Sequence, residues 1–246
     1  MKALIVGGTG NVGKLVVEQL LQRNVHVQAI VRSPDRIPSQ LVANPSLTLI
    51  KASLLELSID ELAEHLRGCD VVISTLGHNL SYNGIPALGV WAPPQDLVEQ
   101  ASRNICHAIE KLQPSSPIRY IMLNTVGVAN PDGSDTHTRS TFERSMVSLM
   151  TTVLPPYRDS VMSAAYLGKE VGTSNKYIEW VAVRPDGFID GEVSSYSLFE
   201  SIRHPFYAPE KVTKANIAHF MGELVTKPET WNQWKFKMPV IIDEKQ

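Results

Sequence analysis

Residues 3–22, ALIVGGTGNVGKLVVEQLLQ, place three glycines at three-residue spacing between an apolar run and a helical pattern. The apolar residues 3–6 predict a strand, and the leucines and valines from residue 15 onward recur with the period of a helix. Such a strand–turn–helix unit can hold a phosphate, because the first N–H groups of a helix have no partner within it. The same stretch could also be a tight turn without a ligand, and the glycine spacing alone does not distinguish the two.

Each glycine has its own expected role. Gly7 permits the sharp turn from strand to helix, Gly10 lets the backbone come close to a pyrophosphate, and Gly13 lets helix and strand pack tightly. The strand before the glycines and the helix after them favour a dinucleotide-binding loop over a turn without a ligand. The loop residues expected to contact the cofactor are Gly7, Thr9, Gly10, Asn11, Val12 and Gly13.

The composition is that of an ordinary globular protein. The 246 residues are 43% hydrophobic and 20% charged, with a formal net charge of −2. Charges of both signs are interspersed, which argues against nucleic acid or an anionic membrane as a partner. No apolar run reaches the roughly 18 residues of a membrane span, and glycines follow the first strand too early for a signal peptide. We therefore expect a cytoplasmic monomer or homodimer that acts on a small-molecule substrate.

Cys69 and Cys106 are the two cysteines, and neither lies in a CxxC motif or a cysteine–histidine cluster. Two cysteines are too few for a disulfide framework, which favours a reducing compartment. No cluster of histidine and acidic residues has the spacing of metal ligands, so we expect no metal site.

Short runs rich in valine and isoleucine alternate with amphipathic stretches along the chain. This alternation predicts βαβ units and an α/β fold with a doubly wound parallel sheet, the Rossmann fold. The expected strands are residues 3–6, 26–31, 47–50, 70–75, 118–124 and 178–183. The expected helices are residues 12–22, 59–67, 96–112, a pair within 138–173, and 211–226.

One domain over residues 1–246 is the economical interpretation, with a small C-terminal extension on the substrate side. Trp231 and Trp234 are expected to cover a last strand. An open α/β sheet places its ligand crevice in the loops that follow its strands. The substrate-side loops are therefore expected at about residues 78–94, 128–157 and 187–208, none of which carries a motif that names the substrate.

The spacing G-x-x-G-x-x-G in GGTGNVG resembles the fingerprint of extended and atypical short-chain dehydrogenases/reductases. Most of the chain resembles the NmrA-like branch of that superfamily and its flavin reductase and biliverdin reductase B relatives. The similar stretches are AIVRSPDRI (29–37), DVVISTLG (70–77), YIMLNTVGV (120–128), DSVMSAAYL (159–167) and EWVAVRPDGFIDG (179–191). The resemblance implies a Rossmann fold that binds a nicotinamide dinucleotide.

The end of the second strand indicates which dinucleotide binds. NAD sites place a carboxylate there, whereas an arginine accommodates the 2′-phosphate of NADP. Arg32 occupies this position, with Ser33 as a hydroxyl donor and Arg36 nearby. A guanidinium presents a planar fork of donors that suits a phosphate. We therefore expect NADP, with NADPH preferred over NADH.

The resemblance implies further cofactor contacts at the ends of the later strands. Related proteins carry an acidic residue beside the adenine after the third strand, whereas this chain has Ser53, followed by Leu54, which is free to cover the ring. The segment after the fourth strand is expected beneath the ribose and nicotinamide. The residues expected to contact the cofactor at these strand ends are Ser53, Leu54, Thr75, Leu76, Gly77, Asn124 and Pro185.

The catalytic pattern of the superfamily is present in part. Thr125 follows the fifth strand as expected, but Tyr166 and Lys169 are three residues apart instead of four. Residues three apart still share a helix face, so a catalytic Tyr166 and a core Tyr166 both remain open, beside Thr125 as the other catalytic candidate. His78 could meet a substrate, although a solvated loop histidine is the preferred interpretation. Arg184 either lies near the nicotinamide or is a buried structural arginine.

These features favour an NADPH-dependent reductase that transfers hydride to a small flat acceptor, such as a flavin, a quinone or another conjugated carbonyl. Such a reaction needs little acid–base machinery, because the cofactor carries the difficult chemistry. One alternative is an NADP-binding redox-sensing regulator without turnover, which the NmrA-like resemblance permits. A sugar-nucleotide epimerase or dehydratase is less favoured, because it would need an intact tyrosine–lysine pair.

Overall fold

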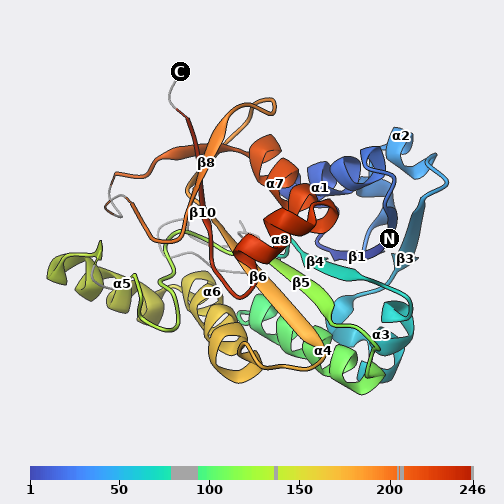
Figure 1. Ribbon diagram of the computed structural model, residues 1–246, viewed down its shortest axis with the longest axis horizontal. Helices are drawn as coiled ribbons and strands as arrows, with labels where there is room; N and C mark the ends of the chain where they lie inside the picture. Colours follow the sequence, from blue (N-terminus) through green and yellow to red (C-terminus); the bar gives the residue numbers. More distant parts are fainter. Residues whose placement is uncertain (79–93, 136–137, 204, 206–207, 245–246) are drawn as a thin grey trace.

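The computed structural model is built on a sheet of eight strands in the order β3-β2-β1-β4-β5-β6-β10-β8 (Figure 1). It describes residues 1–78, 94–135, 138–203, 205 and 208–244. The strands of the sheet are β1 (Lys2–Val6), β2 (His26–Val31), β3 (Leu47–Lys51), β4 (Val71–Ser74), β5 (Ile118–Leu123), β6 (Ile178–Pro185), β8 (Tyr196–Phe199) and β10 (Val240–Asp243). Strands β1 to β6 pair in parallel in the order 3-2-1-4-5-6. This arrangement confirms the predicted Rossmann fold.

The C-terminal part of the chain extends this sheet. Strand β10 pairs in parallel with β6, and β8 pairs antiparallel with β10. A separate two-stranded sheet joins β7 (Gly187–Ile189) to β9 (Lys211–Thr213). These additions match the small C-terminal extension expected from the sequence.

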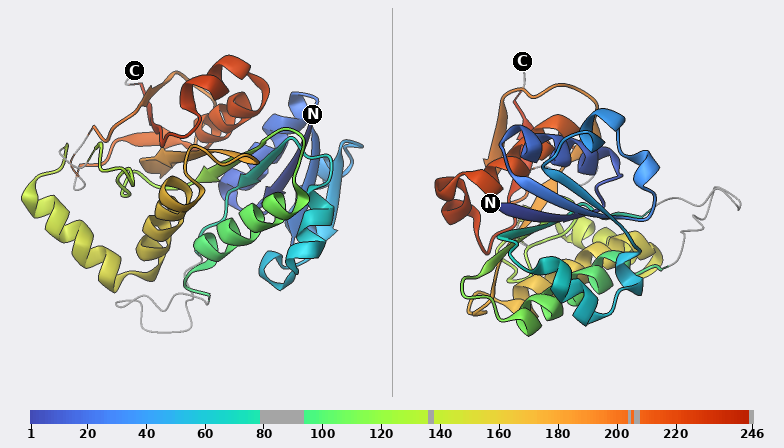
Figure 2. Two further views of the ribbon diagram at one scale, coloured as in Figure 1. Left: turned by 60° about the horizontal axis from the view of Figure 1, so that its bottom comes forward. Right: turned by 90° about the vertical axis from the view of Figure 1, so that its right-hand side faces the viewer.

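Helices cover both faces of the sheet (Figures 1 and 2). Helices α1, α7 and α8 pack on one face, and α3, α4 and α6 pack on the other. The helices are α1 (Asn11–Gln22), α2 (Ser39–Val42), α3 (Ile59–Leu66), α4 (Leu97–Leu112), α5 (Thr141–Val153), α6 (Pro155–Ala165), α7 (Lys214–Thr226) and α8 (Pro228–Trp234). Short helical turns are η1 (Pro34–Arg36), η2 (Leu54–Glu56) and η5 (Tyr166–Val171), a π-helical turn that continues α6.

The two helical layers enclose two hydrophobic clusters, one on each face of the sheet. Trp231 and Trp234 lie in the first cluster together with Ile241 of β10, and both rings are buried. The expectation that these tryptophans cover a last strand is therefore confirmed. The second cluster includes Tyr120 of β5 and Trp180 of β6, packed against α4.

The expected helix over residues 211–226 begins later than predicted. Residues Lys211–Thr213 form β9, and the Thr213 hydroxyl accepts a hydrogen bond from Asn216 N, so Thr213 caps α7. Strands β7, β8 and β9 were missed because runs of three or four residues carry too little periodicity to be recognised. The expected loop 187–208 contains two of them, and residues 79–93 of the expected loop 78–94 lie outside the described residues.

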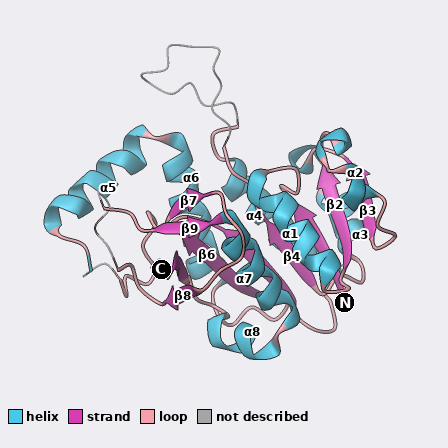
Figure 3. Ribbon diagram, turned by 90° about the horizontal axis from the view of Figure 1, so that it is seen from above, coloured by secondary structure: helices cyan, strands magenta, loops and turns pink. Residues whose placement is uncertain are grey.

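Helix α5 lies apart from the main body of the molecule, as Figure 3 shows. It occupies much of the expected loop 128–157 and begins at a capping box between Ser140 and Glu143. Phe142, Leu149 and Val153 on this helix are exposed. Helix α5 therefore contributes little to the two cores, in contrast to α6, which packs against α4.

The glycine turn brings the start of α1 against the end of β4. Gly7 has a φ of +81°, and a Cβ there would lie 2.6 Å from the backbone carbon of Thr75. A Cβ on Gly13 would collide with the Gly7 carbonyl oxygen and lie 2.7 Å from Thr75 Oγ1. Thr75 in turn donates from its backbone N to Val6 O, at 3.0 Å. Gly7 and Gly13 are thus required by packing alone.

Gly10 differs from its two neighbours in the motif. Its φ of −76° and ψ of 169° are open to any residue. A Cβ on Gly10 would have one described neighbour within 4 Å, the Gly7 carbonyl oxygen at 3.2 Å. The fold therefore does not by itself explain a glycine at this position.

These contacts predict that two alanine substitutions change the free energy of unfolding by different amounts. Gly13→Ala should destabilise the protein by about 3 kcal/mol, because the backbone of Gly7 and the side chain of Thr75 must both move. Gly10→Ala should change the free energy of unfolding by less than about 1 kcal/mol. Urea denaturation of both variants measures the difference, and equal losses would show that the α1–β4 contact is not as tight as described.

Candidate functional site

A cleft of about 390 Å³ opens at the carboxyl ends of the parallel strands. Strands β2 and β3 lie on one side of β1, whereas β4, β5 and β6 lie on the other, so the order reverses between β1 and β4. Ligands of open α/β sheets bind outside this reversal point. The described residues that line the cleft are Gly10, Asn11, Val12, Thr75, Leu76, Gly77, His78, Val98, Leu123, Asn124, Pro156, Ser160, Ser163, Phe188 and Lys214.

One end of the cleft suits a pyrophosphate. Helix α1 begins here with Gly10 as its N-cap, without a side-chain cap and without an acidic residue in its first turn. The first N–H groups of α1 and its positive dipole end are thus available to an anion. Because a Cβ on Gly10 would meet little protein, the backbone there is open to a ligand. Thr9 of the same turn is half-buried.

Lys214 adds a cation to this end of the cleft. It is the first residue of α7, and its Nζ lies 2.7 Å from Asp190 Oδ1. The lysine reaches the cleft through the tertiary packing of α7 against α1. Lys214 was missed in the sequence because no motif surrounds it.

The end of β2 presents the residues expected beside the adenosine. Arg32 follows β2 directly and is exposed, and it has no ion-pair partner in the described part of the chain. Ser33 and Ser53 are half-buried. Leu54, in contrast, is 8% exposed and packs into the core cluster on the α4 face. Its side chain is therefore mostly engaged in the core, and a contact with an adenine ring stays a prediction.

The other end of the cleft lies beyond β4 and β5. Thr75, Leu76 and Gly77 line it as expected, and a Cβ on Gly77 would have no described neighbour within 4 Å. Asn124 also lines it, and its Nδ2 donates to Ser160 O at 3.1 Å. The amide of Asn124 therefore ties the end of β5 to α6 at the cleft wall.

Thr125 and Pro185 are not among the described residues that line the cleft. The Thr125 hydroxyl accepts a hydrogen bond from Gly127 N at 3.3 Å, which stabilises the turn after β5. Pro185 is buried, and its carbonyl oxygen accepts from Val126 N at 3.0 Å. Asn124 therefore lines the cleft, whereas Thr125, the neighbouring residue that the sequence indicated as a catalytic candidate, does not.

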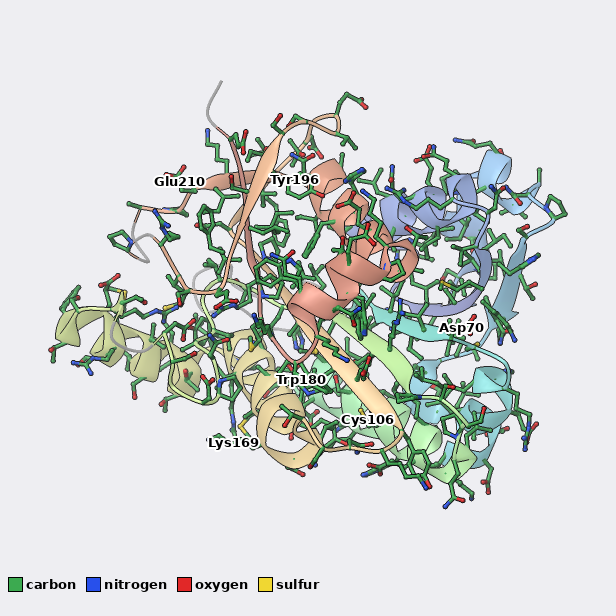
Figure 4. The ribbon with its side chains drawn as sticks, in the orientation of Figure 1. Asp70, Cys106, Lys169, Trp180, Tyr196 and Glu210 are labelled. Carbon is green, nitrogen blue, oxygen red and sulfur yellow. The ribbon has the colours of Figure 1, made fainter. Side chains whose placement is uncertain are left out.

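Tyr166 lies in the hydrophobic core between the sheet and α4, and it is not one of the described lining residues. It is 4% exposed, with the guanidinium of Arg103 4.3 Å from its ring centroid. Burial raises the pKa of its phenol well above the ordinary range. Lys169 is exposed on η5, and Figure 4 labels it on the same helical layer as Cys106. This placement corrects the assignment of Tyr166 as a catalytic residue.

His78 is paired with a buried carboxylate. Its Nε2 lies 2.6 Å from Asp159 Oδ2, and the two side chains are 4% and 0% exposed. Asp159 belongs to α6 and also accepts hydrogen bonds from Val98 N and Glu99 N at the start of α4. The preferred sequence interpretation, a solvated loop histidine, was therefore wrong, because the ring is buried against Asp159 of α6.

Arg184 is the buried structural arginine of the two interpretations left open. Its side chain is fully buried, and Nη1 lies 2.6 Å from Asp135 Oδ2. It also donates to the backbone carbonyls of Val128, Glu200 and Met238. Burial lowers the pKa of the guanidinium, and the Asp135 carboxylate opposes that shift. Arg184 therefore joins β6 to the segments after β5 and β8.

Phe188, Ser160 and Ser163 complete the cleft and were missed in the sequence. Phe188 lies on β7 and is 49% exposed. The two serines lie on α6, one helical turn apart from each other. Single residues of these types carry no motif, so the sequence offered no signal for them.

The described residues contain neither a metal-binding cluster nor a membrane-spanning helix. No group of three or more histidine, cysteine or acidic side chains could hold a metal ion among them. None of the helices that the structure describes combines the length and apolar character of a membrane span. Cys69 and Cys106 are both buried as free thiols.

Residues 7–228 match the family model described as NAD(P)H-binding, so the chain belongs to the NAD(P)H-binding family. Over 63 residues the chain is 40% identical to an uncharacterised chloroplast protein of Arabidopsis thaliana. That match covers 26% of this chain and 22% of the relative, so the chain matches less than a quarter of the length of this relative.

Solved structures share the whole fold at low sequence identity. An oxidoreductase of Lactococcus lactis is similar with a TM-score of 0.69 and 18% identity, over 100% of this chain and 92% of that chain. An anaerobilin reductase of Escherichia coli has a TM-score of 0.67 and 19% identity, over 100% and 98%. A candidate NADH-flavin reductase of Streptococcus pneumoniae has a TM-score of 0.66 and 20% identity, over 99% and 100%. At these identities the likeness establishes the fold.

The core position of Tyr166 gives a testable expectation. Tyr166→Phe should leave the affinity for NADPH within about twofold of the unmodified protein and change the unfolding free energy by less than about 1.5 kcal/mol, because it removes one hydroxyl from the core. Fluorescence titration and urea denaturation measure the two quantities. A large loss of NADPH affinity in a folded Tyr166→Phe variant would show that Tyr166 takes part in cofactor binding.

Proposed function

We propose that this protein is an NADPH-dependent oxidoreductase of the atypical short-chain dehydrogenase/reductase type, which transfers hydride to a small flat acceptor. The observation that carries this proposal is the continuity of the cleft. One cleft joins the uncapped start of α1 at Gly10 to a second end lined by Asn124, His78 and Phe188. A dinucleotide bound at the first end thus reaches toward an acceptor at the second.

The residues present fit a nicotinamide dinucleotide. The open backbone at Gly10 and the free N–H groups of α1 suit the pyrophosphate, with Lys214 as the nearby cation. The exposed Arg32 after β2 suits a 2′-phosphate, which favours NADPH. When bound, NADPH supplies the hydride; the protein holds both partners in position and limits the access of water.

The acceptor end of the cleft has the character of a site for a flat, uncharged molecule. Its apolar lining residues are Leu76, Val98, Leu123, Pro156 and Phe188. Asn124, Ser160 and Ser163 supply polar groups that can orient a carbonyl. Lys214 is the one cation among the described lining residues, and it is paired with Asp190. This balance favours a conjugated carbonyl, a quinone or an uncharged flavin over an anionic acceptor.

The similar proteins support the same class of reaction. The family is NAD(P)H-binding, and two of the similar structures are an oxidoreductase and an anaerobilin reductase. Their low identity to this chain leaves the acceptor to be identified by experiment.

Steady-state oxidation of NADPH tests the proposal. We expect turnover with at least one of riboflavin, menadione and cinnamaldehyde, measured by the loss of NADPH absorbance. Gly10→Val is the control, because its side chain would occupy the space of the pyrophosphate without disturbing the fold. NADPH binding without turnover of any acceptor would contradict the proposal and support a redox-sensing regulator.

Arg32→Ala tests the choice of cofactor. Loss of one charge-assisted phosphate contact costs about 1.5–3 kcal/mol, so NADPH should bind roughly ten- to a hundred-fold more weakly. NADH lacks the 2′-phosphate, and its affinity should stay nearly unchanged. Arg144→Ala on the outlying helix α5 is a matched loss of one exposed arginine, and it should affect neither cofactor. Equal losses for NADPH and NADH in Arg32→Ala would show that Arg32 does not recognise the phosphate.

A further inference from the structure

The pair formed by His78 and Asp159 lies at the acceptor end of the cleft. His78 follows the end of β4 by four residues and lines the cleft beside Leu76 and Asn124. Its imidazole is 4% exposed, and Asp159, at 2.6 Å from Nε2, is fully buried. A histidine in this position is fixed by its surroundings and is not a mobile surface group.

The hydrogen bonds of Asp159 determine which nitrogen of His78 carries hydrogen. Asp159 Oδ1 accepts from Glu99 N, and Oδ2 accepts from Val98 N and faces His78 Nε2. A carboxylate can only accept hydrogen bonds, so Nε2 must donate. Because both oxygens are held at the start of α4, Asp159 is not free to turn toward Nδ1. The carboxylate therefore holds the imidazole with Nε2 protonated.

Nδ1 of His78 is buried without a hydrogen-bond partner among the described residues. A buried nitrogen left unpaired costs about 1–3 kcal/mol, so its persistence calls for an explanation. Nδ1 accepts a hydrogen bond when the imidazole is neutral and donates one when it is an imidazolium. His78 is a lining residue of the cleft, so a ligand oxygen that displaces the atoms covering Nδ1 would satisfy it in either state.

We propose that His78 is the proton donor of this site, that Asp159 positions it, and that the acceptor is a conjugated aldehyde or ketone. This inference rests on the proposed NADPH-dependent reduction. A flavin or quinone yields a weakly basic anion on reduction, whereas an aldehyde or ketone yields an alkoxide that needs an acid beside it. Among flavins, quinones and conjugated carbonyls, the paired histidine thus favours the carbonyls as acceptors.

The carbonyl receives its hydride and its proton from different groups. The carbonyl carbon receives the hydride and forms a C–H bond, while the C=O π pair moves to oxygen. The oxygen takes the proton from Nδ1 of the imidazolium, and water later returns a proton to His78. One carbonyl, one NADPH and one proton thus give one alcohol and one NADP⁺. Asp159 keeps its proton-free form and stabilises the imidazolium by its charge.

The other described groups at this end are poorly suited to give a proton. Tyr166 lies in the core, and Thr125 is engaged in the turn after β5. The hydroxyls of Ser160 and Ser163 and the amide of Asn124 are weak acids that can orient a carbonyl without protonating it. His78 is the one imidazole among the described lining residues.

His78→Gln is the informative variant, because the amide nitrogen of glutamine can still donate to Asp159 while the second ring nitrogen is lost. The probes are cinnamaldehyde, which needs a proton, and N-methylacridinium, which takes hydride without one. We expect His78→Gln to lower turnover of cinnamaldehyde by about a hundred-fold and to leave acridinium reduction within about threefold. His107→Gln on the exposed face of α4 makes the same change outside the cleft and should alter neither.

Imidazole NMR adds a readout that does not depend on turnover. In the unmodified protein we expect the neutral form of His78 to carry its hydrogen on Nε2, and the imidazolium that gives the proton to carry hydrogen on Nδ1 as well. Nδ1 should shift when NADP⁺ and cinnamyl alcohol are added. In Asp159→Asn an amide nitrogen in the place of Oδ2 loses the bond from Val98 N and donates to Nε2, which should transfer the hydrogen to Nδ1. His107 should not respond to either change.

The outcomes separate the two proposals. Absence of turnover of both probes, of riboflavin and of menadione by the unmodified protein would overturn the reductase function itself, and this inference with it. Turnover of acridinium, riboflavin or menadione without any aldehyde or ketone would overturn the acceptor class. Normal aldehyde turnover in His78→Gln, equal losses with both probes, or an Nδ1 signal indifferent to the alcohol would overturn the role of His78 while the reductase function stands.

Discussion

The contact between the start of α1 and the end of β4 is the constraint on which the remaining structure depends. Gly7, Gly13 and Thr75 meet there with no room for a Cβ on either glycine. Because of this contact, the N–H groups of α1 face the reversal point between β1 and β4 instead of the sheet face. The end of the cleft at Gly10 therefore lies at the centre of the sheet, and Asn124 after β5 and Phe188 after β6 line the cleft as well.

Buried charges organise that other end. Asp159 caps the start of α4 from α6, where the N-cap residue Asp96 makes no side-chain cap of its own in the described structure. Arg184 and Asp135 form a second buried pair, surrounded by backbone carbonyls. Removing one partner of such a pair is strongly destabilising, because the other is left as an uncompensated charge. The first pair joins α6 to the start of α4 and reaches the cleft through His78, and the second joins β6 to Val128 and Glu200.

Much of this protein could be predicted from its sequence, because the relevant signals are local. The parallel strands β1 to β6 are rich in valine, isoleucine and leucine, and Gly7, Gly10 and Gly13 have a spacing typical of a strand–turn–helix unit. Arg32 is likewise set by its place one residue after β2. These features depend on neighbours within a few residues, so the Rossmann fold and the glycine turn that lines one end of the cleft could be predicted.

The acceptor end was decided by tertiary structure. His78 and Asp159 are 81 residues apart, and their sequence neighbours give no sign that α4 and α6 enclose them together. Tyr166 and Arg184 each allowed two interpretations, and the packing of η5 against α4 and the position of Asp135 resolved them. Phe188 and Lys214 reach the cleft from strand β7 and helix α7. Whether a polar side chain lies in water, in a core or in a cleft depends on which distant segments cover it, and that is determined when the whole chain packs.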